Sequence, residues 1–318
     1  MKVLVIGATG YVGARVARKL KDKGFVVHGL ARSESSRAKI EAAGYVPVEG
    51  DLLKRDTLRA AVTQMDAVIH AGLPGDSIND GVPAFDQDHL AIETMLSEMK
   101  GQNKTFIYST GALTVADERT IGKVGEPIPE NECARKPMPM VAQRAATENM
   151  VLDAAELGIR TVVVRIPHVY GDGGNFVLPY LIDAAEREGR GVYIGEGQNT
   201  ISLVHVDDLA DLYVLALEKS PAGRLYQPAS FDMRMGEIAA RVSQEMGLGG
   251  RTASIPFEKA KEAWGLGPAL VVGLNSQLGA DDANRVLGWA PKNMSLDAEI
   301  AYMVDKARRR GDDALAAQ

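Results

Sequence analysis

The segment Met1-Lys-Val-Leu-Val-Ile-Gly-Ala-Thr-Gly-Tyr-Val-Gly13 decides the fold of this chain. Its mostly apolar start predicts a short buried strand over residues 2–6, and glycines follow at Gly7, Gly10 and Gly13. Apolar residues then recur at helical spacing up to residue 20, which predicts an amphipathic helix. A strand, a glycine turn and a helix together can hold a pyrophosphate, because free N–H groups at the helix N-terminus bind the anion.

Each glycine has an expected role in such a turn. Gly7 allows a tight bend, Gly10 lets the backbone approach the phosphates, and Gly13 lets the helix pack close to the strand. The alternative is an accidental glycine turn, but the strand before it and the helix after it favour a nucleotide site. The residues expected to contact a dinucleotide here are Gly7, Thr9, Gly10, Tyr11, Val12 and Gly13.

The glycine spacing is G-x-x-G-x-x-G, and it resembles the short-chain dehydrogenase/reductase superfamily in its extended and atypical branches. These branches include nucleotide-sugar epimerases and dehydratases and several ketone and aldehyde reductases. Further landmarks follow in order, so the resemblance covers roughly residues 1 to 300. It implies an α/β fold, a Rossmann-type doubly wound parallel sheet with a smaller C-terminal substrate lobe.

The first half of the chain alternates between strand-like and helix-like segments, as a doubly wound sheet requires. The predicted strands are 2–6, 25–30, 46–48, 67–70, 105–108 and 161–166. The predicted helices include 33–43, 54–63, part of 83–100, 138–157 and 207–219. We expect a dinucleotide-binding domain over 1–170 and a smaller substrate-binding lobe over 171–318, with part of 200–225 returning to the first domain.

Composition is typical of a soluble enzyme. The 318 residues are 46% hydrophobic, and the net charge of −6 offers no basic surface for nucleic acid. No apolar run reaches the ~18 residues that span a bilayer, and a strand starting at residue 2 or 3 leaves no room for a signal peptide. Cys133 is the only cysteine, so no internal disulfide is possible. We therefore expect a cytoplasmic protein without a membrane, nucleic-acid or metal partner.

The end of the second predicted strand favours NADP over NAD. In this fold an acidic residue there binds the ribose 2′-hydroxyl, whereas here the chain reads Ala31-Arg32-Ser33. Arg32 can pair with a 2′-phosphate and Ser33 can donate a hydrogen bond, with Arg37 as a further candidate one helical turn on. The alternative is a solvated arginine followed by an ordinary serine N-cap.

The family resemblance adds two further cofactor segments. It implies that Asp51, with Leu52 beside it, binds the adenine amino group, and that the backbone of Ala71 and Gly72 lines the cofactor. Without the resemblance, Asp51 is equally typical of a turn or a helix cap.

The catalytic positions depart from the family pattern. Most members carry Tyr-x-x-x-Lys on the helix after the fifth strand, where the tyrosine relays a proton and the lysine lowers its pKa. The family usually places a glutamate four residues after the lysine. Anchoring on Glu148 puts Arg144 at the lysine place and Met140 at the tyrosine place. The family's serine or threonine falls on Gly111, and an offset of one residue would restore Thr110.

An arginine at the lysine place resembles an uncharacterised subgroup that carries His-x-x-x-Arg. Met140 has no proton to give, so we expect it to form a flexible apolar wall. Arg144 can bind the nicotinamide ribose or a substrate oxygen as a permanent cation. The alternative is a surface pair between Arg144 and Glu148.

The segment from Arg165 to Asp172 resembles the family's Arg-Pro-x-x-Val-Tyr-Gly signature, which borders the nicotinamide and the substrate cleft. It implies that Pro167 contacts the cofactor and that His168 and Tyr170 are candidate proton donors. The alternatives are a packing role for Tyr170, with its hydroxyl already bonded, and a cleft-wall role for His168.

Two later segments also match family landmarks. In Val204-His-Val-Asp-Asp-Leu-Ala210 we expect Asp207 or Asp208 to cap the following helix and His205 to be structural. Trp289 lies in a segment similar to the family's C-terminal packing signature, so we expect it in the core.

The leading hypothesis is an NADP-dependent oxidoreductase of a small carbonyl compound or alcohol. Its proton would come from His168, Tyr170, Thr110 or water. The alternatives are an epimerase or dehydratase with tightly bound NADP and a non-catalytic NADP sensor, which the lost catalytic residues favour. Family members commonly dimerise through the helices that flank the fifth strand, so we expect a homodimer. The second of these helices carries exposed-looking apolar residues, namely Met140, Val141, Met150 and Val151.

Overall fold

The computed structural model describes residues 1–73, 82–130 and 137–316. Its centre is a seven-stranded sheet in the order β10-β6-β5-β4-β1-β2-β3, in which every neighbouring pair is parallel. The strands are β1 (Lys2–Ile6), β2 (Val26–Ala31), β3 (Val46–Glu49), β4 (Ala67–His70), β5 (Thr105–Gly111), β6 (Arg160–Ile166) and β10 (Arg224–Tyr226). The strand order reverses between β1 and β4, and in such sheets ligands bind at the carboxyl ends beside that reversal.

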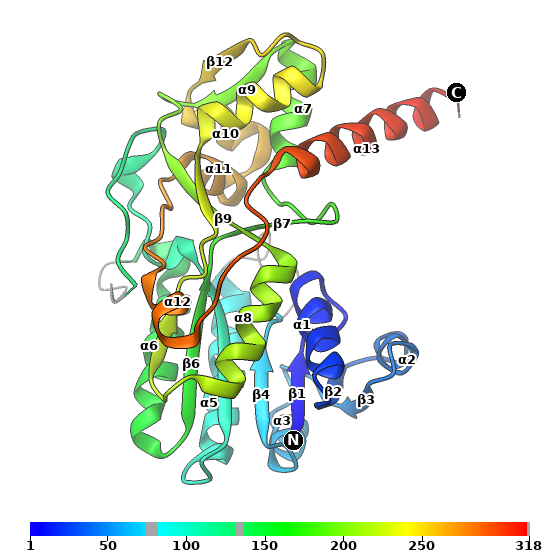
Figure 1. Cartoon of the computed structure of the whole chain (residues 1–318), viewed down its shortest axis with the longest axis vertical. Coiled ribbons are helices and arrows are strands. Elements are labelled where there is room, and N and C mark those ends of the chain that lie inside the picture. Colours follow the sequence, from blue (N-terminus) through cyan, green and yellow to red (C-terminus); the bar gives the residue numbers. More distant parts are fainter. Residues whose placement is uncertain (74–81, 131–136, 317–318) are drawn as a thin grey trace.

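Helices cover both faces of this sheet (Figure 1). On one face lie α1 (Tyr11–Asp22) and α8 (Val206–Lys219). The short α12 (Asp281–Leu287) packs beside α8 and belongs to the same apolar core. The other face carries α3 (Arg55–Thr63), α5 (Val82–Met99) and α6 (Ala142–Asp153). The short α2 (Glu34–Ala42) packs against the β2–β3 edge. The expected Rossmann-type α/β fold is therefore confirmed.

A second group of elements has its own apolar core and lies beyond the carboxyl ends of the sheet (Figure 1). Its strands are β7 (His168–Tyr170), β9 (Thr200–His205) and β11 (Phe231–Arg234) in one sheet, and β8 (Gly191–Ile194) and β12 (Thr252–Ile255) in another. Its helices are α7 (Leu178–Glu188), α9 (Met235–Glu245), α10 (Phe257–Trp264), α11 (Leu266–Gly273) and α13 (Asp297–Ala316). Because α8 and β10 pack with the first sheet, the chain crosses between the two groups more than once. A domain boundary after residue 170 stays a prediction.

In the described ranges, four short 3-10 turns connect these elements. They are η1 (Ala112–Thr114), η2 (Glu118–Thr120), η3 (Pro139–Val141) and η4 (Ala154–Leu157). The predicted helix over 138–157 is therefore α6 with a 3-10 turn at each end. Pro139 stands at the start of η3, and Gly158 ends η4 in the left-handed conformation at φ 74°.

The cap of α8 and the later strands differ from the sequence-based expectations. Neither Asp207 nor Asp208 caps α8, because the ring nitrogen of His205 accepts the Asp207 N–H at 3.2 Å. The side chain of Asp208 instead accepts the backbone N–H groups of residues 292 and 293, which lie beyond α12. The strands after β6, which are β7 to β12, were not predicted, and β10, for example, has only three residues and gives too short a pattern.

The expected exposed apolar stripe on α6 is also wrong. Val141 and Val151 are fully buried, and Met140 and Met150 are partly buried against apolar neighbours. Their apolar character is explained by packing within the chain.

None of the helices in the described ranges is both long enough and apolar enough to span a membrane. Within the same ranges, no three or more His, Cys, Asp or Glu side chains gather in a way that could hold a metal ion. Cys133 lies outside the described residues.

Candidate cofactor pocket and active site

The glycine turn brings β1, α1 and the end of β4 into close contact. A Cβ atom on Gly7, whose φ is +85°, would lie 2.7 Å from the carbonyl oxygen of Ala71. A Cβ atom on Gly13 would lie 2.1 Å from the carbonyl oxygen of Gly7. Both positions therefore require glycine, since a side chain at Gly7 would meet the backbone after β4 and one at Gly13 would push α1 away from the turn after β1.

The N-terminus of α1 remains open to a ligand. Its N-cap is Gly10, which has no side chain to bond the first N–H groups, and the first turn contains no acidic residue. The positive end of the helix dipole is consequently not neutralised there by a carboxylate. This end of α1 fits the pyrophosphate of a dinucleotide.

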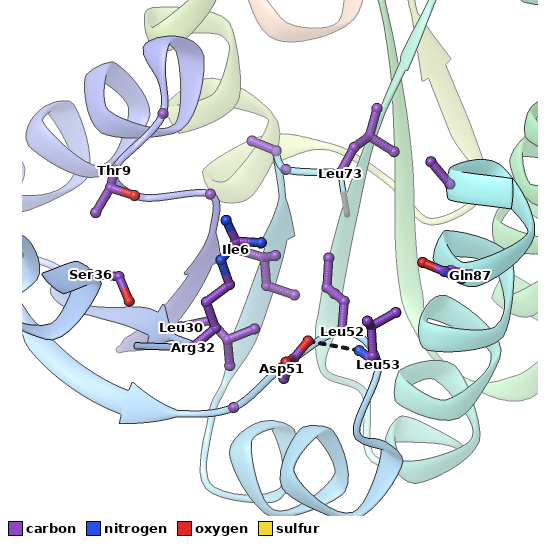
Figure 2. A pocket seen from close by; sticks show the side chains of 16 residues that line it. Ile6, Thr9, Leu30, Arg32, Ser36, Asp51, Leu52, Leu53, Leu73 and Gln87 are labelled. Atoms are coloured by element: carbon purple, nitrogen blue, oxygen red, sulfur yellow. Dashed lines mark hydrogen bonds between the residues drawn. The ribbon is translucent and has the colours of Figure 1, made fainter. Parts of the chain in front are cut away.

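A cavity of about 710 Å³ lies at the carboxyl ends of β1, β2 and β4 (Figure 2). Its volume is within the range of about 300–1,000 Å³ that small-molecule and cofactor sites occupy. Its walls are Ile6, Gly7, Thr9, Gly10, Leu30, Arg32, Ser36, Gly50, Asp51, Leu52, Leu53, Ala71, Gly72, Leu73, Ala84 and Gln87.

The cavity wall brings together many of the residues proposed for cofactor binding. Those that line it are Gly7, Thr9, Gly10, Arg32, Asp51, Leu52, Ala71 and Gly72. Those that do not line it are Tyr11, Val12, Gly13, Ser33, Arg144 and Pro167. The lining residues that were not proposed from the sequence are Ile6, Leu30, Ser36, Gly50, Leu53, Leu73, Ala84 and Gln87. For Ser36, the Ser-x-x-Ser spacing from Ser33 was a usable signal, because it is a helix-capping pattern.

At the end of β2, Arg32 is an exposed arginine whose guanidinium points into the pocket (Figure 2). Ser33 caps α2, its hydroxyl oxygen accepting the Ser36 N–H at 3.2 Å. The carboxylate of Asp51 accepts the Leu53 N–H at 3.0 Å, so it stabilises its own turn while lining the cavity. Among the lining residues, Asp51 is the single acid, and it follows β3 rather than β2.

Arg144 is held at the end of β5. Its Nε donates to the hydroxyl oxygen of Thr110 at 3.4 Å, and its Nη2 donates to the carbonyl oxygen of Ser109 at 3.1 Å. The guanidinium lies over the Phe85 ring, 5.3 Å from the centroid. These contacts bring Thr110 and Arg144 together and fix the cation at the carboxyl edge of the sheet.

The surface pair between Arg144 and Glu148 is not formed. Glu148 is wholly buried and pairs with Arg165, whose Nε lies 3.3 Å from Glu148 Oε2. Arg165 also donates from Nη1 to the side-chain oxygen of Gln227 at 2.6 Å. This buried pair ties α6 to β6 and explains why a glutamate stands four residues after Arg144.

His168 and Tyr170 have structural partners. The Nε2 of His168 lies 3.0 Å from the hydroxyl of Ser276, and loss of hydration lowers the pKa of His168 to about 4. The Tyr170 hydroxyl donates to the Asn293 carbonyl at 2.9 Å, and burial raises the pKa of Tyr170. A histidine that is neutral at pH 7 is a poor acid, so these contacts favour the wall and packing alternatives.

A buried polar cluster lies directly behind the cavity wall. His70 Nε2 is 3.0 Å from a carboxylate oxygen of Asp88, and the rings of His70 and Tyr108 meet edge to face at 6.0 Å. All three side chains are buried, and burial raises the pKa of Tyr108. Since His70 precedes Ala71 and Asp88 follows Gln87, the cluster joins two parts of the wall. Sequence reasoning did not identify it.

Comparison with known proteins agrees with this geometry. The pattern of the NAD dependent epimerase/dehydratase family matches residues 3–228. An uncharacterized protein from Schizosaccharomyces pombe is 33% identical over 310 residues, which cover 95% of this chain and 98% of that protein. The 4-hydroxy-2-methyl-3-oxo-4-farnesyl-3,4-dihydroquinoline-1-oxide ketoreductase of Stigmatella aurantiaca is 29% identical over 97% of this chain and 90% of its own length.

Solved structures share the fold. The dTDP-glucose 4,6-dehydratase of Streptomyces venezuelae, crystallised with NAD, superposes with a TM-score of 0.76 at 18% identity, over 97% of each chain. The family pattern covers most of the chain. It includes the glycine turn and the ends of β1, β2 and β4, where the cavity lies. The chain therefore belongs to the NAD-dependent epimerase/dehydratase family and is an NAD(P)-dependent oxidoreductase of the extended short-chain dehydrogenase/reductase type.

Proposed function

We propose that the protein is an NADP-dependent reductase of a carbonyl compound, in which Arg144 supplies the electrostatic stabilisation at the reacting oxygen. The observation that carries the proposal is the position of Arg144, fixed by Ser109, Thr110 and Phe85 at the end of β5. A cation in this place can stabilise the negative charge that develops on a carbonyl oxygen during reduction.

The residues of the cavity fit a phosphorylated dinucleotide. The open N-terminus of α1 would hold the pyrophosphate, and Asp51 and Leu52 would lie at the adenine. Arg32 and Ser36 line the cavity where β2 ends, and they would bind a ribose 2′-phosphate. When bound, the dinucleotide supplies a hydride to the carbonyl carbon, and a proton from solvent or a side chain completes the alcohol.

Arg144 keeps hydrogen-bonding capacity for a ligand. Its Nε and Nη2 contact the end of β5, and among the described residues no hydrogen bond holds its Nη1. Thr110 accepts from Arg144, so its own O–H can relay a proton toward the same oxygen while the hydroxyl takes a replacement proton from water. With His168 neutral and Tyr170 bonded to Asn293, we assign the proton to Thr110 or to water.

The test is NADPH oxidation with a panel of aldehydes, ketones and quinones. We expect Arg144→Ala to lower turnover by roughly a hundredfold, the usual effect of removing one such donor. The matched control is Arg187→Ala, because Arg187 is an exposed arginine on α7. Turnover that survives Arg144→Ala would refute the role of Arg144. Tight NADPH binding without turnover of any carbonyl compound would favour the sensor.

We also propose that the protein is a homodimer. The proposal rests on the family resemblance and on Leu90 of α5, which is a large apolar side chain that remains 43% exposed.

A further inference from the structure

An apolar cluster separate from the three large cores lies between β5, α6 and the second group of elements. Its buried members include Met138 and Val141 beside η3, and Leu270 and Leu274 at α11. Phe85, Leu113 and Met140 pack against this cluster but stay partly exposed, and we call these three residues the apolar wall. Each of these three side chains keeps part of its apolar surface exposed in the described structure.

The apolar wall adjoins the proposed reaction site. Phe85 belongs to the wall and also lies under the Arg144 guanidinium at 5.3 Å. Leu113 follows the end of β5 by two residues, in η1. A compound whose oxygen binds Arg144 would therefore extend over the wall.

Open space lies at the same edge. A Cβ atom built on Gly111 would meet no atom of the described residues within 4 Å, apart from those of its two chain neighbours. Gly111 and Met140 stand where most family members carry a hydroxyl group, so both positions here lack a hydrogen-bonding side chain. A sugar ring placed against them would lose hydrogen bonds to water without gaining replacements.

We propose that the substrate is an aldehyde or ketone with an unbranched apolar substituent of several carbons. Its carbonyl oxygen binds at Arg144 and its apolar substituent covers Phe85, Leu113 and Met140. The inference rests on the proposed function and extends it by naming the substrate class. Met140 adapts to such a chain because its side chain is flexible and polarizable.

Binding tests this proposal independently of turnover. Straight-chain primary amides carry a carbonyl oxygen that this chemistry does not reduce, and their dissociation constants can be measured by calorimetry on the NADPH-loaded protein. We expect the constant to fall about three- to fourfold for each added methylene, until the wall is covered. The kcat/KM of straight-chain aldehydes should rise by a similar factor.

Variants of Met140 test whether the gain in affinity per methylene arises at the apolar wall. Met140→Gln keeps the length of the side chain but makes it polar, so we expect the gain per methylene to fall below about twofold. Met140→Leu should retain the gradient, which separates loss of apolar surface from misfolding. Met294→Gln is the matched control, since Met294 is 55% exposed and lies outside the apolar wall.

The outcomes distinguish the two proposals. Reduction of aldehydes without any dependence on chain length, or an unchanged gradient in Met140→Gln, would overturn the apolar substrate and leave the reductase standing. A gradient in amide binding without reduction of any carbonyl compound would overturn the reductase and leave the apolar ligand site standing. Faster conversion of a nucleotide sugar than of any alkyl aldehyde would overturn the substrate class.

Discussion

At the residue scale, two arginines have different surroundings, and we propose a different role for each. Arg144 is tied to Ser109 and Thr110, which fixes the direction of its charge. Arg32 is exposed at the cavity, and no ion pair to another described residue neutralises it. An arginine held by hydrogen bonds can stabilise charge on an atom at a fixed position. An exposed arginine can instead adjust its side chain to bind a 2′-phosphate.

Cofactor preference therefore depends on Arg32. We expect Arg32→Gln to weaken NADPH binding by about 1.5–3 kcal/mol, the scale of a hydrogen bond to a charged group, and to leave NADH binding unchanged. That corresponds to roughly ten- to 150-fold in the dissociation constant measured by fluorescence titration. Arg37→Gln is the control, because Arg37 lies one turn further and does not line the cavity. Equal affinities of the unmodified protein for NADPH and NADH would contradict the assignment.

At the element scale, a histidine with a lowered pKa connects β7 to the segment after α11. His168 on β7 contacts the Ser276 hydroxyl at 3.0 Å, and Ser276 also forms a bridge with Ile201 of β9. The pKa of His168 is lowered to about 4, so the folded state binds fewer protons than the unfolded chain between about pH 4 and 6.5.

The sign of the pH dependence follows from that difference. Stability from His168 is fully present above pH 6.5 and is lost as the pH falls toward 4, by up to about 3 kcal/mol in the free energy of unfolding. His168→Gln should lose much of this pH dependence, because glutamine can bond Ser276 without titrating. Urea unfolding from pH 4 to 8 measures the effect. The pKa of His28 is also lowered by burial, so His28 adds the same pH dependence to the free energy of unfolding of both proteins. Parallel curves for the two proteins would refute the prediction.

Whether the sequence predicts a feature depends on whether the residues that form it lie close together in the sequence or in different elements. The glycine turn and the end of β2 were predictable, because each is encoded by neighbouring residues. The Glu148–Arg165 and His70–Asp88 pairs join different elements, and nothing in a local pattern selects one partner among many charged residues. The helix cap at His205 was missed because aspartate is the commoner cap, while Asp208 bonds a distant segment.

At the scale of the whole molecule, contacts near α1 join the two groups of elements. The Tyr11 hydroxyl donates to the Gly171 carbonyl at 2.6 Å, and Arg15 on α1 pairs with Asp172 in the same loop after β7. Gly173 in the same loop donates its N–H to Glu299 of α13 at 3.1 Å. The helix that would hold the pyrophosphate is thus bonded to the loop after β7, so the two groups of elements are directly connected at this point.

Oligomeric state is the remaining property at this scale. The proposed dimer would bury Leu90 of α5 against its partner, which would remove its 43% exposed side chain from water. Light scattering at micromolar concentration should then give twice the chain mass of 34.0 kDa. Leu90→Arg should shift the particle toward 34.0 kDa, because a charge would be buried without a partner. Leu266→Arg, on the equally exposed Leu266 of α11, should leave the mass unchanged. A 34.0 kDa particle from the unmodified protein would exclude the dimer.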